Sequence, residues 1–183
     1  MNIFIQLEKE HSKENSQKII AYIGNDAERY AQLMDCFFMK TEDYRVPQRA
    51  AHVVSLYFDK NSTFIEPYLP RLMERLNDEK LDGALKRNIL RVLQFTQIDE
   101  EYRSLVYNRS FELLGNPTEA VAVRAFAMTV LYNITEHYIE LKSELLGLIE
   151  MVLEEPNTSP GIQNRGKKVA GKLYKDLENS QSL

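Results

Sequence analysis

The sequence predicts an all-α fold, an α-α superhelix of about four helical hairpins with polar capping helices. Three observations support this prediction. Apolar residues recur at the spacing of one helix face over most of the chain, and alternating strand patterns are almost absent. Capping residues interrupt these runs at short intervals. A basic residue that opens a small or apolar helix recurs every 37–41 residues.

The predicted helices begin and end at residues that cap helices well. Asn116 stands directly before Pro117, and a capping side chain followed by proline is typical of a helix N-terminus. Gly24 is suited to a helix C-terminus. Connections of only a few residues force consecutive helices to pack antiparallel. Residues 3–5 offer a weak strand pattern. The predicted helices span residues 13–23, 26–40, 46–59, 63–77, 82–96, 100–114, 117–134, 136–154 and 160–178.

Four segments share one pattern, in which a basic residue opens a run of small or apolar residues. Their arginines are 38, 37 and 41 residues apart, at Arg49, Arg87, Arg124 and Arg165. In the second segment Lys86 competes with Arg87 for the basic position. Each segment follows a leucine-rich or aromatic helix that ends in acidic or amide residues. This period indicates a solenoid, in which each hairpin buries its apolar face against its neighbours.

The pattern is clearest over residues 116–125, where Val123 and Arg124 open the second helix. It resembles the HEAT repeats, in which a first helix ends in an acidic turn and a Val-Arg-like pair opens the second. The resemblance spans about residues 26–178. Tetratricopeptide repeats are the competing assignment, but the tryptophan that marks them is missing. We expect a single domain, 1–183, with an N-terminal cap at 1–24, repeats at 26–61, 62–98, 99–135 and 136–178, and a disordered tail at 179–183.

Composition limits the possible partners. The chain has 183 residues, a net charge of −4 and a pI near 5.5, so nucleic acid is a disfavoured partner, although a local basic patch would survive this average. Cys36 is expected to be a buried thiol in a reducing compartment. The N-terminus lacks the pattern of a signal peptide, and no apolar run is long enough to span a membrane. We therefore expect a soluble, cytoplasmic protein.

Catalytic and metal-binding signatures are missing from the sequence. The three histidines, His11, His52 and His137, are far apart and show no metal-ligand spacing. No phosphate-binding loop or nucleophile elbow occurs. We therefore expect no metal, no cofactor and no enzymatic activity.

The row of arginines has two interpretations. As a functional surface it would line a concave groove and bind an acidic peptide or a phosphate chain. The resemblance favours a structural role instead, since in HEAT repeats this arginine pairs with the acidic residue of the turn between the helices. Asp43 and Arg49 have that spacing. The expected structural ladder comprises Asp43, Arg49, Arg87, Arg124 and Arg165.

A second basic cluster lies in the last predicted helix, between Arg165 and Lys175. One interpretation is a patch that binds nucleic acid or an acidic partner. The helix before it is rich in glutamate. Two adjacent helices of opposite charge are expected to neutralise each other along their shared edge.

The leading functional hypothesis is a non-enzymatic interaction module. In the HEAT geometry the second helices line the concave side, where a protein or peptide would bind. The candidates to face this groove are His52, Arg91, Met128, Thr129, Tyr132 and Lys168. The alternative is a nucleic-acid-linked protein similar to the HEAT-like alkylpurine-DNA glycosylases. A homodimer through an apolar end or through residues 1–12 remains open.

Overall fold

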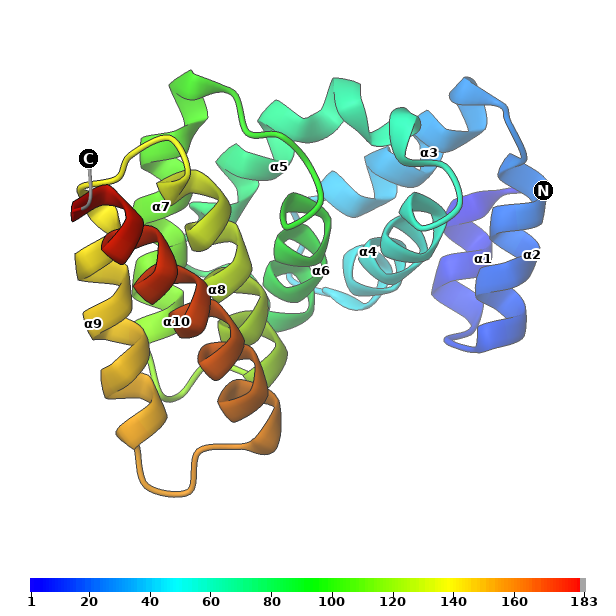
Figure 1. Ribbon diagram of the computed structural model, residues 1–183. Helices are drawn as coiled ribbons and strands as arrows, with labels where there is room; N and C mark the ends of the chain where they lie inside the picture. Colours follow the sequence, from blue (N-terminus) through cyan, green and yellow to red (C-terminus); the bar gives the residue numbers. More distant parts are fainter. Residues whose placement is uncertain (182–183) are drawn as a thin grey trace.

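A computed structural model describes residues 1–181 as a continuous stack of helices (Figure 1). No strand occurs in this range, which confirms the all-α prediction. The elements are α1 (Ile3–Lys9), α2 (Lys13–Ile23), α3 (Ala27–Phe38), α4 (Arg45–Phe58), the 3-10 helix η1 (Ser62–Tyr68), α5 (Leu69–Leu76), α6 (Gly83–Leu93), α7 (Glu100–Gly115), α8 (Val121–Thr135), α9 (Leu141–Glu154) and α10 (Pro160–Gln181).

The helices form four hairpins in two layers: α3 with α4, η1 and α5 with α6, α7 with α8, and α9 with α10. The second helices, α4, α6, α8 and α10, pack on one another along the stack, whereas the first helices contact one another more sparsely. Figure 1 shows this stack running from α1 and α2 at one end to α9 and α10 at the other. Because the inner layer of a curved stack has the closer spacing, the second helices lie on the concave side.

One hydrophobic core runs through all the hairpins, from α1 to α10. Each second helix contributes side chains that are almost wholly buried, such as Val53, Leu90 and Leu131. A single hairpin has no such interior, so each depends on its neighbours for burial.

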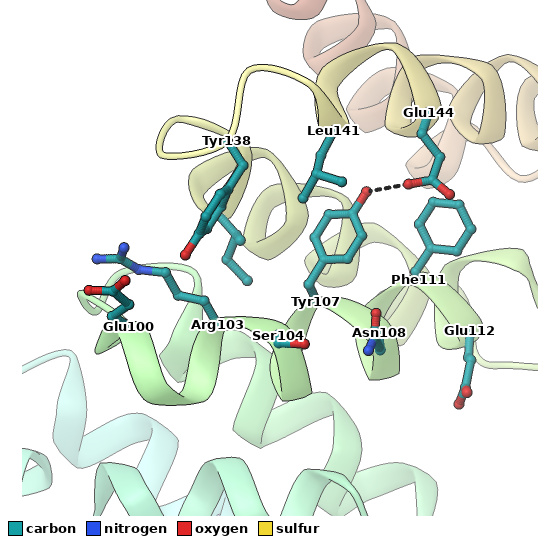
Figure 2. Close-up of a pocket in the computed structure, with 11 residues that line it drawn as sticks. Glu100, Arg103, Ser104, Tyr107, Asn108, Phe111, Glu112, Tyr138, Leu141 and Glu144 are labelled. Carbon is teal, nitrogen blue, oxygen red and sulfur yellow. Dashed lines mark hydrogen bonds between the residues drawn. The ribbon is translucent and has the colours of Figure 1, made fainter.

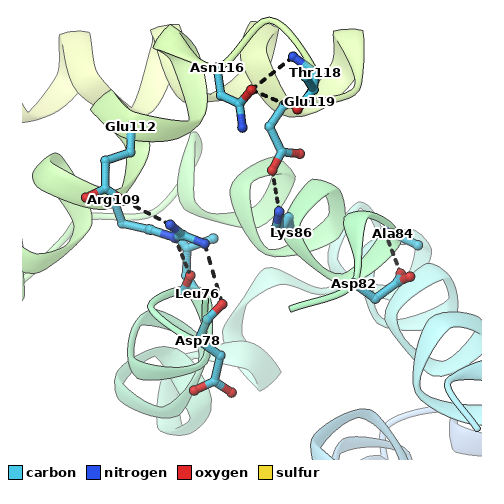
Figure 3. A network of polar contacts seen from close by, with 10 residues as sticks. All are labelled: Leu76, Asp78, Asp82, Ala84, Lys86, Arg109, Glu112, Asn116, Thr118 and Glu119. Carbon is cyan, nitrogen blue, oxygen red and sulfur yellow. Dashed lines mark hydrogen bonds and ion pairs between the residues drawn. The ribbon is translucent and has the colours of Figure 1, made fainter. Parts of the chain in front are cut away.

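Three helices start later than the sequence predicts, and local side chains explain two of these starts. Asn116 Oδ1 accepts hydrogen bonds from the backbone N–H and the hydroxyl of Thr118, so residues 117–120 form a turn and α8 begins only at Val121 (Figure 3). The predicted helix 63–77 is divided into η1 and α5, because Pro67 lacks a backbone donor. The predicted helix 136–154 begins at Leu141, after a turn.

The weak strand pattern at residues 3–5 is wrong, because these residues open helix α1. The side chain of Asn2 accepts a hydrogen bond from the N–H of Ile5 and so caps this helix. Ile3 and Leu7, one helical turn apart, are buried against α3 and α4. The adjacent apolar residue Phe4 stays exposed, and the resulting short run of apolar residues imitates a strand.

The expected disordered tail is also corrected in part. Residues 179–181 continue α10, which ends at Gln181 rather than near residue 178. The rest of that tail, residues 182–183, lies outside the described residues.

Candidate functional site

The two layers of the stack carry opposite charge. Within their helix bounds, α4, α6, α8 and α10 contain eleven Lys and Arg against two Asp and Glu, a balance of +9. The first helices, α3, η1, α5, α7 and α9, contain six Lys and Arg against ten Asp and Glu, a balance of −4. The net charge of the whole chain therefore conceals a basic concave layer.

Part of this basic layer is neutralised by contacts between hairpins. Arg124, only 4% exposed, donates to both carboxylate oxygens of Glu155 (2.8 and 2.6 Å) and to the backbone oxygen of Leu114 (2.9 Å). The Arg124 guanidinium lowers the pKa of the Glu155 carboxyl. Lys86 forms the corresponding ion pair with Glu119, in the turn of the next hairpin (Figure 3). Arg124 therefore joins two neighbouring hairpins.

The other members of the predicted ladder differ from the expectation. Asp43 pairs with Arg45 (2.5 Å), whose hydrogen bonds hold the pKa of Asp43 at about 2, and does not pair with Arg49. Arg49 donates instead to the backbone oxygens of Leu7 and Glu8 (2.7 and 2.9 Å), and so closes the C-terminal end of α1. Asp43 lies two residues before α4, which begins at Arg45, so its carboxylate reaches Arg45 and not Arg49, six residues further along the chain.

The two remaining arginines do not make the contact that Arg124 makes with an acid in the turn of the next hairpin. In α6 Lys86 makes this contact, whereas Arg87 is exposed and has no hydrogen bond or ion pair with the described residues. In α10 the residue equivalent to Arg124 is Gln163. Its side chain donates to the backbone oxygen of Leu153 (3.1 Å), ten residues earlier, as Arg124 donates to the backbone oxygen of Leu114. Arg165 lies two residues further along and has no carboxylate partner among residues 1–181.

The predicted groove residues also divide into free and engaged side chains. Met128 is fully buried in the core, so placing it on the groove was wrong. Tyr132 is nearly buried, and its hydroxyl donates to Asp176 (3.1 Å). Thr129 accepts from Arg165 (2.5 Å), and Arg91 donates to Asp59 (2.7 Å). Both are already committed to contacts between second helices.

The side chains of Lys168 and His52 have no hydrogen bond or ion pair with the described residues. Lys168 is exposed and has no ion pair within the described part of the chain. His52 is half-buried on α4, where its ring packs edge-on against His11, with 5.7 Å between ring centroids. Burial and the nearby charges of His11, Arg87 and Arg91 lower the pKa of His52. These four side chains, called the histidine-arginine cluster below, come from three different parts of the chain.

A basic strip runs along the concave side of α10. It consists of Arg165, Lys168, Lys172 and Lys175, which are spaced by three, four and three residues and so share one helix face. The ammonium group of Lys172 lies 4.6 Å from the ring centroid of Tyr132 on α8. No ion pair joins this strip to the glutamates of α9 in the described structure. The expected neutralisation along the edge between α9 and α10 is therefore wrong.

The only ion pair found between α9 and α10 within residues 1–181 has the reverse polarity. Lys142 of α9 binds Asp176 of α10 (2.6 Å) and lowers the pKa of that carboxyl. The reversal leaves the lysines of the strip open to solvent and to a partner.

The site can bind anions by hydrogen bonds and charge. His11 was not expected at this site. Arg87 was expected in the structural ladder, and Lys172 and Lys175 were expected to be neutralised by the helix before them. The sequence feature that would have indicated Arg87, Lys172 and Lys175 is the excess of basic residues in the second helix of each hairpin. The net charge of the whole chain hides this excess.

Other chemistry finds little support in the described residues. No group of three His, Cys, Asp or Glu residues that would hold a metal ion occurs among them. Burial raises the pKa of the Cys36 thiol to about 11, which disfavours the reactive thiolate. None of the helices within residues 1–181 is long and apolar enough to cross a membrane.

Comparison with known proteins agrees with this architecture. The family model described as HEAT repeat domain matches residues 4–173. No curated protein and no solved structure gave a match. HEAT repeats generally mediate protein–protein interaction and are typically non-enzymatic. Since the match covers far more than half of the chain, from α1 into α10, the chain belongs to the HEAT-repeat family.

Proposed function

We propose that this HEAT-repeat chain is a non-enzymatic interaction module that binds an acidic protein segment on its concave, second-helix face. The observation that carries the proposal is the charge difference between the layers, +9 on the second helices and −4 on the first. Complementary charge directs association and selects a partner of opposite sign.

Two groups of basic side chains would hold the segment at its ends. The histidine-arginine cluster lies at α4, at α6 and at His11 before α2, and the basic strip lies on α10. Between them α8 presents the half-buried side chains of Phe126 and Thr129. Neighbouring helix axes are about 9 Å apart, so four second helices span about 27 Å. An extended segment of about eight residues covers that length.

The cations without a structural partner supply the attraction. Arg91 and Arg165 are engaged within the protein, but Arg87, Lys168 and Lys175 have no ion pair with any residue from 1 to 181. They are therefore free to bind carboxylates without breaking a contact between hairpins. Exposed pairs of this kind weaken as salt rises.

The proposal is tested with a fluorescent glutamate-rich peptide of about twelve residues, titrated with the full chain and followed by anisotropy. The double variant Arg87→Glu with Lys168→Glu removes one free cation from each end of the groove. We expect its affinity for the peptide to fall at least about tenfold, because two attractions become repulsions. Added salt should weaken binding to the wild-type chain.

Lys18→Glu, on the exposed face of α2, makes the same kind of charge reversal away from the groove and is the control. It should change the affinity little. The control changes the net charge by half as much as the double variant. A loss of binding free energy in the control that is half or more of the loss in the double variant would mean that net charge alone attracts the peptide, and would contradict the proposal. Circular dichroism melts confirm that each variant is folded.

The alternative, a nucleic-acid-linked protein of the alkylpurine-DNA glycosylase type, is examined in the same assay with a DNA duplex. Glu136 stands exposed at the end of α8, and Asp59 lies beside Arg91; such acids on the basic side favour a peptide over a continuous phosphate chain. Tighter binding of the duplex at low salt, lost in the double variant, would replace the peptide by DNA.

A further inference from the structure

A second candidate site lies on the opposite layer of the stack, between the first helices α7 and α9. A cavity of about 640 Å³ opens there, lined by residues of α7, the end of α8, the turn after it and the start of α9 (Figure 2). This volume falls within the range typical of ligand sites. The sparse contact between α7 and α9 leaves the space between them open.

One end of the cavity combines aromatic rings with a carboxylate. The rings of Tyr107 and Phe111 stack with 5.8 Å between their centroids. The Tyr107 hydroxyl donates to Glu144 (3.4 Å), and burial together with this carboxylate raises the pKa of Tyr107. Figure 2 shows Glu144 directly above these rings. Glu144 is exposed and has no cationic partner in the described part of the chain.

The other end already contains a cation. Arg103 lies there beside Glu100 and Tyr138, and its Nε donates to the backbone oxygen of Ile98 (3.1 Å) (Figure 2). A positively charged ligand would be repelled from that end. The Glu144 carboxylate, which no cation neutralises within residues 1–181, and the ring of Phe111 therefore favour a cation at the Glu144 end.

We infer that this cavity binds an arginine side chain presented by a basic protein segment. A guanidinium stacks on aromatic faces and matches a carboxylate through two parallel hydrogen bonds. Glu144 supplies the carboxylate, and the half-buried ring of Phe111 supplies the aromatic surface. Tyr107 is buried; it supports the ring of Phe111 and donates a hydrogen bond to Glu144. The exposed acid Glu100, which also lines the cavity, adds complementary charge for the rest of the segment. The site lies on the first-helix layer and is independent of the acidic partner proposed for the concave face.

The test uses an arginine-rich peptide of about six residues and a lysine-rich peptide of the same charge, each titrated with the full chain by calorimetry. The arginine peptide should bind about fivefold more tightly, because lysine has neither the planar stacking surface nor the bidentate geometry. Equal affinity for the two peptides would mean general attraction to an acidic protein and would overturn the inference.

Two variants assign the binding to the cavity. Glu144→Gln should weaken the arginine peptide about tenfold, since it removes the charge from the hydrogen-bonded pair. Phe111→Leu keeps the apolar volume but loses the aromatic face, and should weaken binding about fivefold. Glu154→Gln, also exposed on α9 but at its far end, makes the same change in charge and should leave the affinity unchanged.

Each remaining outcome is decisive. Unchanged affinity in both cavity variants would place the peptide elsewhere and overturn the inference. Self-association of the wild-type chain in sedimentation that is lost in Glu144→Gln would identify a second copy as the occupant, and would also overturn it. Failure of the glutamate peptide to bind the concave face has no bearing on these results.

Discussion

Arg124 shows how a charged residue can hold neighbouring repeats together. Its guanidinium is buried in α8, yet every contact described above is with a charged or carbonyl oxygen, at Leu114 within its own hairpin and at Glu155 in the next. A buried charge is tolerated only when its partners replace the water it has lost. The same side chain therefore links two hairpins and specifies how they are oriented.

Removing one partner should cost far more than removing both. Arg124→Ala leaves Glu155 without its cation and the Leu114 carbonyl without its donor, so we expect the free energy of unfolding to fall by about 3 kcal/mol. The double variant Arg124→Met with Glu155→Met should recover part of this loss, because no uncompensated charge remains. Urea denaturation followed by circular dichroism measures both values.

Arg45→Ala is the matched control, since Arg45 forms an exposed pair with Asp43. It should leave the urea midpoint nearly unchanged. If Arg124→Ala behaved like Arg45→Ala, the buried ion pair would have no structural role.

The role of single residues was predictable where it depends on a short sequence motif, and unpredictable where it depends on which side of a helix packs against its neighbours. The Val123–Arg124 motif marked the one arginine of the predicted ladder that pairs with an acid of the next turn. Met128 was expected on the groove, but α8 packs on four neighbouring helices, α6, α7, α9 and α10, and so buries more than one face. Arg87 was predicted to make the contact that Lys86 makes in the structure. Adjacent residues point about 100° apart around a helix, and only packing decides which of the two faces the turn.

At the scale of elements, α1 shows how a short helix acquires structure from its neighbours. Seven residues are too few for a stable isolated helix. Burial of Ile3 and Leu7, the cap at Asn2, and the two hydrogen bonds from Arg49 supply what the segment itself lacks. Periodicity over so short a stretch does not separate a helix from a strand, which is why the sequence indicated the wrong element.

The buried face of α1 should contribute to the stability of the whole stack. Leu7→Ala removes a fully buried side chain at the contact with α4, and we expect it to lower the free energy of unfolding by about 2–4 kcal/mol. Ile5→Ala on the same helix changes a side chain that is 54% exposed, and should have a small effect. Thermal and urea unfolding of the two variants gives the comparison; similar values would show that α1 is not part of the cooperative fold.

At the scale of the whole molecule, the all-α class and most of the longer helices were predictable, because they depend on regular apolar periodicity. Several helix starts were not, since local side chains and turns decide them. The division of charge between the layers was not seen, although it requires only the sequence and the hairpin assignment. The cavity between α7 and α9 was beyond prediction, since it depends on how far two first helices separate. This separation follows from contacts spread over the whole stack.

The same charge arrangement determines how stability depends on pH. The pKa of Glu155 is lowered below its ordinary value of 4.5, and that of Asp176 below 3.8, chiefly by hydrogen bonds from Arg124 and Lys142. The folded state therefore binds fewer protons than the unfolded state as the solution is acidified. Their contribution is fully present above pH 4.5 and is lost as the pH falls through the lowered values.

His52 also lowers the stability of the fold on acidification, and it does so at a higher pH than the two carboxyls. Its pKa lies below 6.5 in the folded protein, so the unfolded chain takes up the proton first and stability declines gradually as the pH falls below 6.5. We expect two phases in the free energy of unfolding, measured with urea between pH 8 and pH 3. His52→Gln should flatten the phase near pH 6, and Glu155→Gln should reduce the phase below pH 4.5. A single phase that both variants leave unchanged would show that neither group titrates differently in the folded and unfolded chain.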